Sequence, residues 1–130
     1  MIEPNWVLNE IVIAVHQMLI AEHGGSLGIR DEGLLESALT RPRQVFFYEA
    51  EASIFDLAAS HGFSLAKNHP FIDGNKRAAL SIAAIFLEIN GYTFDAPEPE
   101  AVVVFEKLAA GDPSEKELAK WFSGNSTLNV

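Results

Sequence analysis

Hydrophobic and polar positions divide the 130-residue chain into segments with helical periodicity. Between Asn9 and Glu22, aliphatic residues recur at helical spacing, as on the buried face of an amphipathic helix: Ile11, Val12, Val15, Leu19 and Ile20. Asn9 is a candidate N-cap for this helix, and Gly24-Gly25 would end it. The segment also holds His16 and His23, which we interpret as packed or solvated residues and not as ligands.

Capping signals mark the starts of three later helices. Asp31 precedes a short helix that should end before Pro42, because proline and the residue before it disfavour helical backbone. The segments Ser53-x-x-Asp56 and Ser114-x-x-Glu117 match the capping box. Pro99 suits the first turn of another helix, which Gly111 would end.

The remaining segments lack helical periodicity. The segment Arg43 to Tyr48 is the most strand-like in the chain, and its aromatic residues would pack on the core. Tyr92 to Phe94 is predicted to be briefly extended, and Ser123 to Val130 to be a frayed tail. The charged run Arg30-Asp31-Glu32 is explained by a helix cap and a surface salt bridge at least as well as by a charged site.

One segment is apolar on all sides. From Ala78 to Ile89 only Ser81 and Glu88 are polar, and Asn90-Gly91 is a typical helix end. A helix with apolar side chains all round is buried all round, which predicts a central core helix. The run is too short and too interrupted to span a bilayer.

Composition and length place the chain among ordinary globular proteins. Because 48% of the residues are hydrophobic and 21% are charged, we expect one compact domain over 1–130. This domain should be an all-α bundle around the central helix, with or without a small β flap. The absence of cysteine and of a signal-peptide pattern predicts a cytoplasmic protein. The formal net charge of −9 argues against direct binding of nucleic acid.

The chemistry gathers in the nine residues before the central helix, His69-Pro70-Phe71-Ile72-Asp73-Gly74-Asn75-Lys76-Arg77, which we call the motif. The first N–H groups of a helix lack internal partners and bind phosphate readily. Lys76 and Arg77 add positive charge, Asp73 is an oxygen ligand suited to Mg²⁺, and His69 can exchange a proton near neutral pH. These groups together predict phosphoryl or nucleotidyl transfer.

The motif resembles the signature of the Fic/Doc (Fido) superfamily, and specifically its Doc (death-on-curing) branch. Fic proteins carry glycine where this chain has Lys76 and a second arginine where it has Leu80, so both differences favour Doc. The resemblance extends to two earlier blocks, Gly28 to Leu39 with Arg41-Pro42, and Gly62 to Asn68. In this family a flap before the active loop can present a strand edge to the target, which is a second interpretation of Arg43 to Tyr48.

The resemblance implies a role for each motif residue. His69 would be the general base, Asp73 would hold Mg²⁺, and Phe71 would anchor the loop. Phosphate binding would fall to Gly74 and Asn75, through backbone and carboxamide, and to the cations Lys76 and Arg77. Lysine at position 76 implies that ATP binds with its γ-phosphate in line, giving a protein kinase and not an adenylyltransferase.

The resemblance also implies the biological context. The protein would be the toxin of a type II toxin–antitoxin system that phosphorylates a threonine or serine of a translation factor, elongation factor Tu, and so arrests growth. Its partner would be a Phd-like antitoxin that folds on binding. Two alternatives stay open from the sequence: AMP transfer of the Fic type, and a catalytically silent binding module.

Overall fold

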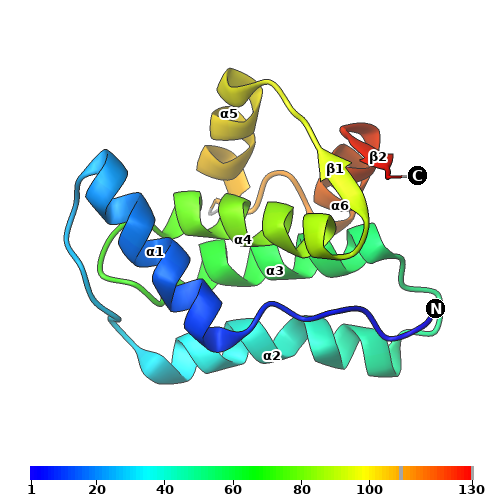
Figure 1. The fold of residues 1–130 in the computed structure, drawn as a ribbon, viewed down its shortest axis with the longest axis horizontal. Helices are drawn as coiled ribbons and strands as arrows, with labels where there is room; N and C mark the ends of the chain where they lie inside the picture. Colours follow the sequence, from blue (N-terminus) through cyan, green and yellow to red (C-terminus); the bar gives the residue numbers. More distant parts are fainter. Residues whose placement is uncertain (109, 130) are drawn as a thin grey trace.

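The computed structural model describes residues 1–108 and 110–129, and these residues form a helical bundle with one small antiparallel sheet (Figure 1). The elements, in chain order, are α1 (Asn9–His23), α2 (Glu32–Tyr48), α3 (Ile54–Asn68), α4 (Asn75–Ile89), β1 (Tyr92–Phe94), α5 (Glu98–Leu108), α6 (Glu115–Gly124) and β2 (Ser126–Leu128). The predicted all-α class is therefore confirmed. No helix among the described residues is long and apolar enough to cross a membrane.

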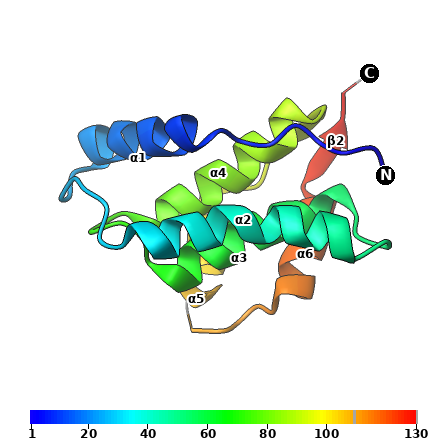
Figure 2. The same ribbon diagram turned by 90° about the horizontal axis from the view of Figure 1, so that it is seen from below.

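Two helices, α3 and α4, share the centre of the bundle. The predicted central helix, α4, is buried or half-buried along its length except at Arg77 and at its last two residues, Glu88 and Ile89. The preceding helix, α3, is equally central, because α2, α4, α5 and α6 contact it, while α1, α3, α5 and β1 contact α4. Figure 2 shows α2 running alongside α3, with α1 on one side and α6 on the other.

Small residues on α3 allow this close packing. Ala58, Ala59 and Ala66 are fully buried, and a Cβ placed on Gly62 would lie 3.2 Å from the Phe105 ring of α5. Burial of apolar area contributes roughly 25 cal/mol per Å². The centre therefore depends on close contact as well as on large side chains.

The strand predicted over Arg43–Tyr48 is wrong, because α2 continues without a break to Tyr48. The prediction that this helix ends before Pro42 is also wrong, because α2 passes through this residue, which is buried in the core. Burial of one face of α2 against α3 outweighs both the lost backbone bond of Pro42 and the β propensity of the segment. Of the aromatic residues there, Phe46 packs against the core, whereas Phe47 and Tyr48 are exposed.

The frayed tail predicted from Ser123 is also wrong over the described residues. Helix α6 runs to Gly124, and β2 pairs antiparallel with β1 in the register Tyr92↔Leu128, Thr93↔Thr127 and Phe94↔Ser126. The extended segment predicted over Tyr92–Phe94 is confirmed as β1. Val130, the last tail residue, lies outside the described residues.

Three of the four predicted caps are confirmed. Asp31 accepts a hydrogen bond from the Leu34 amide, and complete capping boxes start α3 and α6. Asn9 does not cap α1, because the N-cap position falls on Leu8, which makes no side-chain bond to the helix.

The N-terminal segment crosses the bundle and holds a buried histidine in place. Trp6 stacks on Phe86 of α4 at a ring-centroid distance of 5.8 Å and lies 6.2 Å from His61 of α3. Burial lowers the pKa of His61 to about 4, so its imidazole is neutral at physiological pH and donates from Nδ1 to the Leu57 carbonyl. This histidine is a structural residue of the core.

Candidate functional site

The motif forms one wall of a cavity of about 440 Å³ between the start of α4 and helix α5. All six residues predicted to be functional line it, as do apolar residues of α4 and α5. The full lining is His69, Ile72, Asp73, Gly74, Asn75, Lys76, Arg77, Leu80, Ala101, Val102, Phe105 and Glu106. The structure therefore brings the predicted site residues together around a single space.

Helix α4 starts in this cavity without a side-chain cap. Its N-cap is Gly74, whose backbone is left-handed (φ 74°), and no side chain accepts a bond from the first helical N–H groups. The first turn contains no acidic residue and holds Lys76 and Arg77 instead. Unpaired amides and the positive end of the helix dipole favour an anion such as phosphate.

The two cations differ in their partners. Lys76 Nζ lies 3.4 Å from Glu106 Oε2 of α5, in a partly exposed ion pair between two residues that line the cavity. Arg77 is exposed, and its guanidinium has no hydrogen-bond or ion-pair partner within the described part of the chain. An exposed ion pair contributes little stability, so a bound phosphate can replace Glu106 as the partner of Lys76 at small cost. Sequence reasoning missed Glu106, which lies 30 positions from Lys76.

His69 occupies a constrained backbone position. It is the C-cap of α3 and has left-handed dihedrals (φ 48°), the sole non-glycine residue with positive φ among residues 1–108 and 110–129. For an L-residue this conformation costs roughly 1–2 kcal/mol, so neighbouring contacts must hold it. The side chain is exposed at the cavity and accessible to a substrate.

A segment of residues 28–31, the bracing segment, runs beside the loop of residues 69–74, the motif loop. Ile29 and Phe71 form an antiparallel bridge, the Pro70 carbonyl accepts from the Arg30 and Asp31 amides at 2.7 and 3.1 Å, and the Ile72 amide donates to the Gly28 carbonyl at 3.0 Å. These four positions are the first four residues of the block Gly28 to Leu39 that resembles the family. Backbone pairing therefore fixes the motif loop from Pro70 to Ile72.

The arginine of this segment also contacts the loop with its side chain. Arg30 donates from Nε to the His69 carbonyl at 2.7 Å and from Nη2 to the Asn68 carbonyl at 2.9 Å. The predicted surface salt bridge of Arg30 is not found among the described residues, whereas the predicted cap by Asp31 is confirmed.

Phe71 anchors the motif loop in the core, as predicted. Its side chain is 1% exposed, and its ring stacks on the His16 imidazole of α1 with centroids 3.8 Å apart and planes 6° apart. His16 Nε2 lies 2.8 Å from the Asp73 carbonyl oxygen. A carbonyl can only accept, so Nε2 carries the hydrogen. His16 is packed, as predicted, but its contact with the motif loop was missed, because no sequence pattern links positions 57 residues apart.

We expected from the sequence that the Asn75 carboxamide would bind phosphate, but it binds the motif loop and not the open cavity. Its Oδ1 accepts from the Phe71 amide and its Nδ2 donates to the Phe71 carbonyl, both at 2.9 Å. The side chain is thereby directed toward Phe71 in the core. The backbone N–H of Asn75 belongs to the first turn of α4 and keeps its place at the helix start.

The Asp73 carboxylate is oriented by two backbone amides. Oδ1 accepts from Gly74 at 2.9 Å and Oδ2 accepts from Ser26 at 3.3 Å. Each carboxylate oxygen has a second lone pair, so one bond to a cation remains available at each. No group of three or more acidic, histidine or cysteine residues in residues 1–108 and 110–129 could enclose a metal. This donor set fits Mg²⁺, which usually takes one or two carboxylates together with water and substrate phosphates.

Comparison with known proteins identifies the class to which this fold and site belong. The model of the Fic/DOC family matches residues 6–87, a range that includes the bracing segment and the whole motif, and the chain belongs to this family. The chain is 38% identical to "Protein kinase doc" of Escherichia phage P1 over 90 residues, which cover 68% of this chain and 71% of the relative. It is 48% identical to "Toxin Doc" of Mycolicibacterium smegmatis over 69 residues, 52% of this chain and 53% of the relative.

Proposed function

We propose that the chain is the toxin of a type II toxin–antitoxin system and transfers the γ-phosphate of ATP to a threonine or serine hydroxyl of a translation factor, elongation factor Tu. The observation that carries this proposal is the uncapped start of α4, where Lys76, Arg77 and His69 face one cavity. The relatives named a protein kinase and a toxin support both parts of it.

The motif supplies each group that such a transfer needs. His69 takes the proton from the target hydroxyl, whose oxygen forms a bond to the γ-phosphorus while the bond to the leaving ADP breaks. The backbone amide of Asn75 and the cations Lys76 and Arg77 bind the phosphate oxygens and offset their negative charge. Gly74, whose own amide donates to Asp73 Oδ1, lets the backbone approach the phosphate closely. Asp73 would hold Mg²⁺, which supplies further charge neutralisation when bound.

The orientation of ATP is assigned from Lys76. A lysine in the first turn of α4 occupies the space that glycine leaves open in Fic adenylyltransferases, and its ammonium attracts the terminal phosphates. The γ-phosphate therefore lies nearest to the helix start and to His69, and phosphate is transferred in place of AMP.

The biological partners belong to the same proposal. We assign a Phd-like antitoxin that folds on this chain, elongation factor Tu as the target, and growth arrest as the outcome, with residues 1–130 acting as one Fido domain in the cytoplasm. The relative named "Toxin Doc" supports the antitoxin assignment, and the cysteine-free composition fits a reducing compartment.

The reaction is tested with ATP labelled at either the α- or the γ-phosphate. Purified chain, elongation factor Tu and Mg²⁺ should give protein labelled from the γ position alone. Label retained from the α position would instead show AMP transfer, and no label from either position with an active positive control would favour a silent binding module.

Replacing the general base provides the second arm of the test. His69→Ala should lower the rate of transfer by ~10²–10⁴-fold. The matched control is His23→Ala, an exposed histidine at the end of α1, which should leave the rate unchanged. Equal rates for wild type and His69→Ala would exclude the base assignment.

A further inference from the structure

We propose that Arg30 is a positioning residue for the transfer reaction, which fixes the backbone of His69 from outside the cavity. The inference rests on the function proposed above, but part of its test is independent of activity. Arg30 lies in the bracing segment and is absent from the cavity lining, so it acts through His69 and not on the substrate.

The direction of the His69 imidazole depends on the backbone conformation of this residue. No group in the described residues forms a hydrogen bond with this side chain, whereas the Asn75 and Asp73 side chains that line the same cavity both have partners. The left-handed backbone at His69 sets the direction in which its Cβ leaves the chain. A change in this backbone would therefore turn the imidazole away from the reacting hydroxyl.

Arg30 contacts the peptide groups on both sides of the His69 Cα through one planar guanidinium. Its Nε donates to the His69 carbonyl at 2.7 Å and its Nη2 to the Asn68 carbonyl at 2.9 Å. Both carbonyls lie at the C-terminal end of α3, where the helix leaves carbonyls unpaired and the helix dipole favours a cation. Because the guanidinium is planar, two simultaneous bonds fix the relative orientation of the two peptide planes.

Arg30 is itself held in place by contacts on both sides. Its own amide donates to the Pro70 carbonyl at 2.7 Å, and the next residue, Asp31, caps α2 through the Leu34 amide. The Asn68 Nδ2 in turn donates to the Leu34 carbonyl at 3.0 Å. The start of α2 and the end of α3 are thus joined around His69, with Arg30 between them.

A purely structural role for Arg30 makes a different prediction. A residue that only caps α3 would affect the stability of the fold and leave the rate per folded molecule unchanged. A positioning residue lowers kcat while the KM for ATP stays nearly constant, because the phosphate-binding groups on α4 do not contact Arg30.

The kinetic test compares Arg30→Met and Arg30→Lys with Arg43→Met. Arg43 is also an exposed arginine, and its guanidinium lies 5.3 Å from the Trp6 ring, away from the motif. Arg30→Met should lower kcat by ~10–100-fold with little change in KM, since small misplacements of a reacting group have effects of this order. Arg30→Lys, which keeps one donor group but not the planar fork, should fall in between, and Arg43→Met should match wild type. Folded Arg30→Met and Arg30→Lys with wild-type kcat would overturn the proposal.

Carbon chemical shifts of His69 provide the arm that needs no activity. The Cα and carbonyl chemical shifts of His69 report its φ and ψ. They should indicate a left-handed backbone in wild type and in Arg43→Met. In Arg30→Met they should move toward the values of a conformationally averaged backbone. Unchanged shifts in folded Arg30→Met would overturn the proposal even if the rate fell. If wild type transfers no phosphate, the proposed function fails, and the shifts alone decide the role of Arg30.

Discussion

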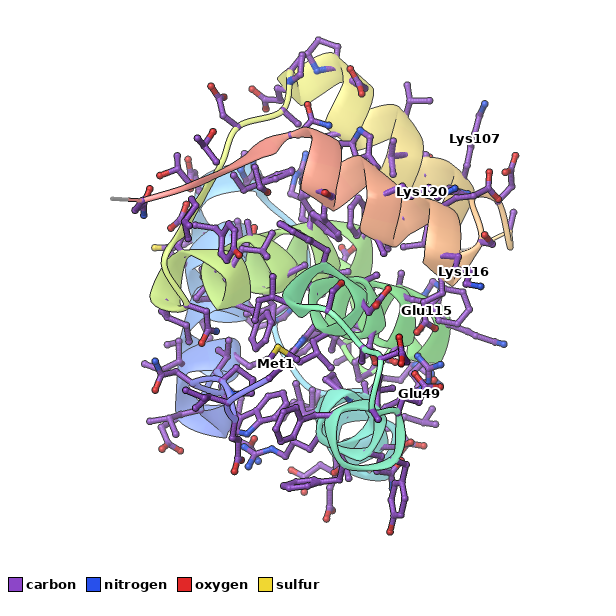
Figure 3. All side chains as sticks on the ribbon, turned by 90° about the vertical axis from the view of Figure 1, so that its right-hand side faces the viewer. Met1, Glu49, Lys107, Glu115, Lys116 and Lys120 are labelled. Carbon is purple, nitrogen blue, oxygen red and sulfur yellow. The ribbon has the colours of Figure 1, made fainter. Side chains whose placement is uncertain are left out.

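The starts of α4 and α6 show two opposite treatments of the unpaired amides at a helix N-terminus. At α6, Ser114 Oγ accepts from the Glu117 amide and Glu117 Oε1 accepts from the Ser114 amide, each at 3.2 Å. Helix α3 begins with the same arrangement. At α4 the N-cap is Gly74, no side chain accepts from the helix, and the first turn holds Lys76 and Arg77. Figure 3 looks onto the end of the molecule where Glu115 and Lys116 begin α6.

This difference separates a helix start that serves stability from one suited to a ligand. An acidic group near a helix N-terminus stabilises the helix by roughly 0.3–1 kcal/mol, whereas a cation there does not stabilise it. Lack of a side-chain cap is not sufficient by itself, because α1 also lacks one and has Glu10 in its first turn. What distinguishes α4 is the combination of free amides, two cations and a cavity lined by His69 and Asp73.

The largest effect is expected where α4 is tied to the motif loop. Asn75→Ala leaves the amide and the carbonyl of buried Phe71 without partners, and each such group costs about 1–3 kcal/mol. We expect the free energy of unfolding, measured with urea, to fall by about 3 kcal/mol. The control is Asn125→Ala at the end of α6, which loses a single bond to the Trp121 carbonyl. Equal losses in the two variants would show that Asn75 does not hold the loop.

The second prediction concerns the two cations. Lys76→Met and Arg77→Met should each weaken ATP binding by ~10–100-fold, since a hydrogen bond to a charged group contributes roughly 1.5–3 kcal/mol. Both variants should unfold at the same or slightly higher urea concentration, because each removes a cation from the positive end of α4.

Titration calorimetry and urea unfolding measure the two quantities on the same samples. Lys120→Met, on α6, is the matched control and should leave the ATP affinity unchanged. A loss of stability without a loss of ATP affinity would mean that these cations support the fold and that the contrast between α4 and α6 is not functional.

Most of the fold could be predicted from local sequence signals. The caps at Asp31, Ser53 and Ser114 and the end of α4 at Asn90 follow from residue types within a few positions of each other. The wrong predictions at Arg43–Tyr48 and Ser126–Leu128 have the same physical cause, which is that tertiary contacts outweigh local sequence preference. Packing of α2 against α3 overrides β propensity, and pairing with β1 orders a tail with no signal of its own.

The site could be predicted as a set of residues but not as an arrangement. The motif is contiguous, so its six proposed functional residues could be named from the sequence, and they line one cavity. Arg30, His16 and Glu106 reach the motif from other elements, 39, 57 and 30 positions away along the chain. Such contacts depend on how helices pack, for which a single sequence contains no periodic or spacing signal.

The smallest expected effect is a pH dependence of stability at the start of α6. Hydrogen bonds from the Ser114 amide and side chain lower the pKa of Glu117 below its ordinary value of 4.5. In the unfolded chain Glu117 takes up its proton at higher pH than in the folded chain. Its contribution to stability is therefore complete above about pH 4.5 and is lost as the pH falls through the lowered folded-state pKa.

Ser114→Ala removes the hydroxyl that caps α6 and weakens the capping box, so it tests this pH dependence. Such a replacement costs about 1 kcal/mol at neutral pH. The difference in unfolding free energy between wild type and Ser114→Ala should narrow in acid, and Ser123→Ala, an exposed serine later in α6, should follow wild type at every pH. A gap that stays constant through the acid range would mean that the carboxylate of Glu117 adds nothing to the cap. The side-chain cap that distinguishes the start of α6 from that of α4 would then consist of Ser114 alone.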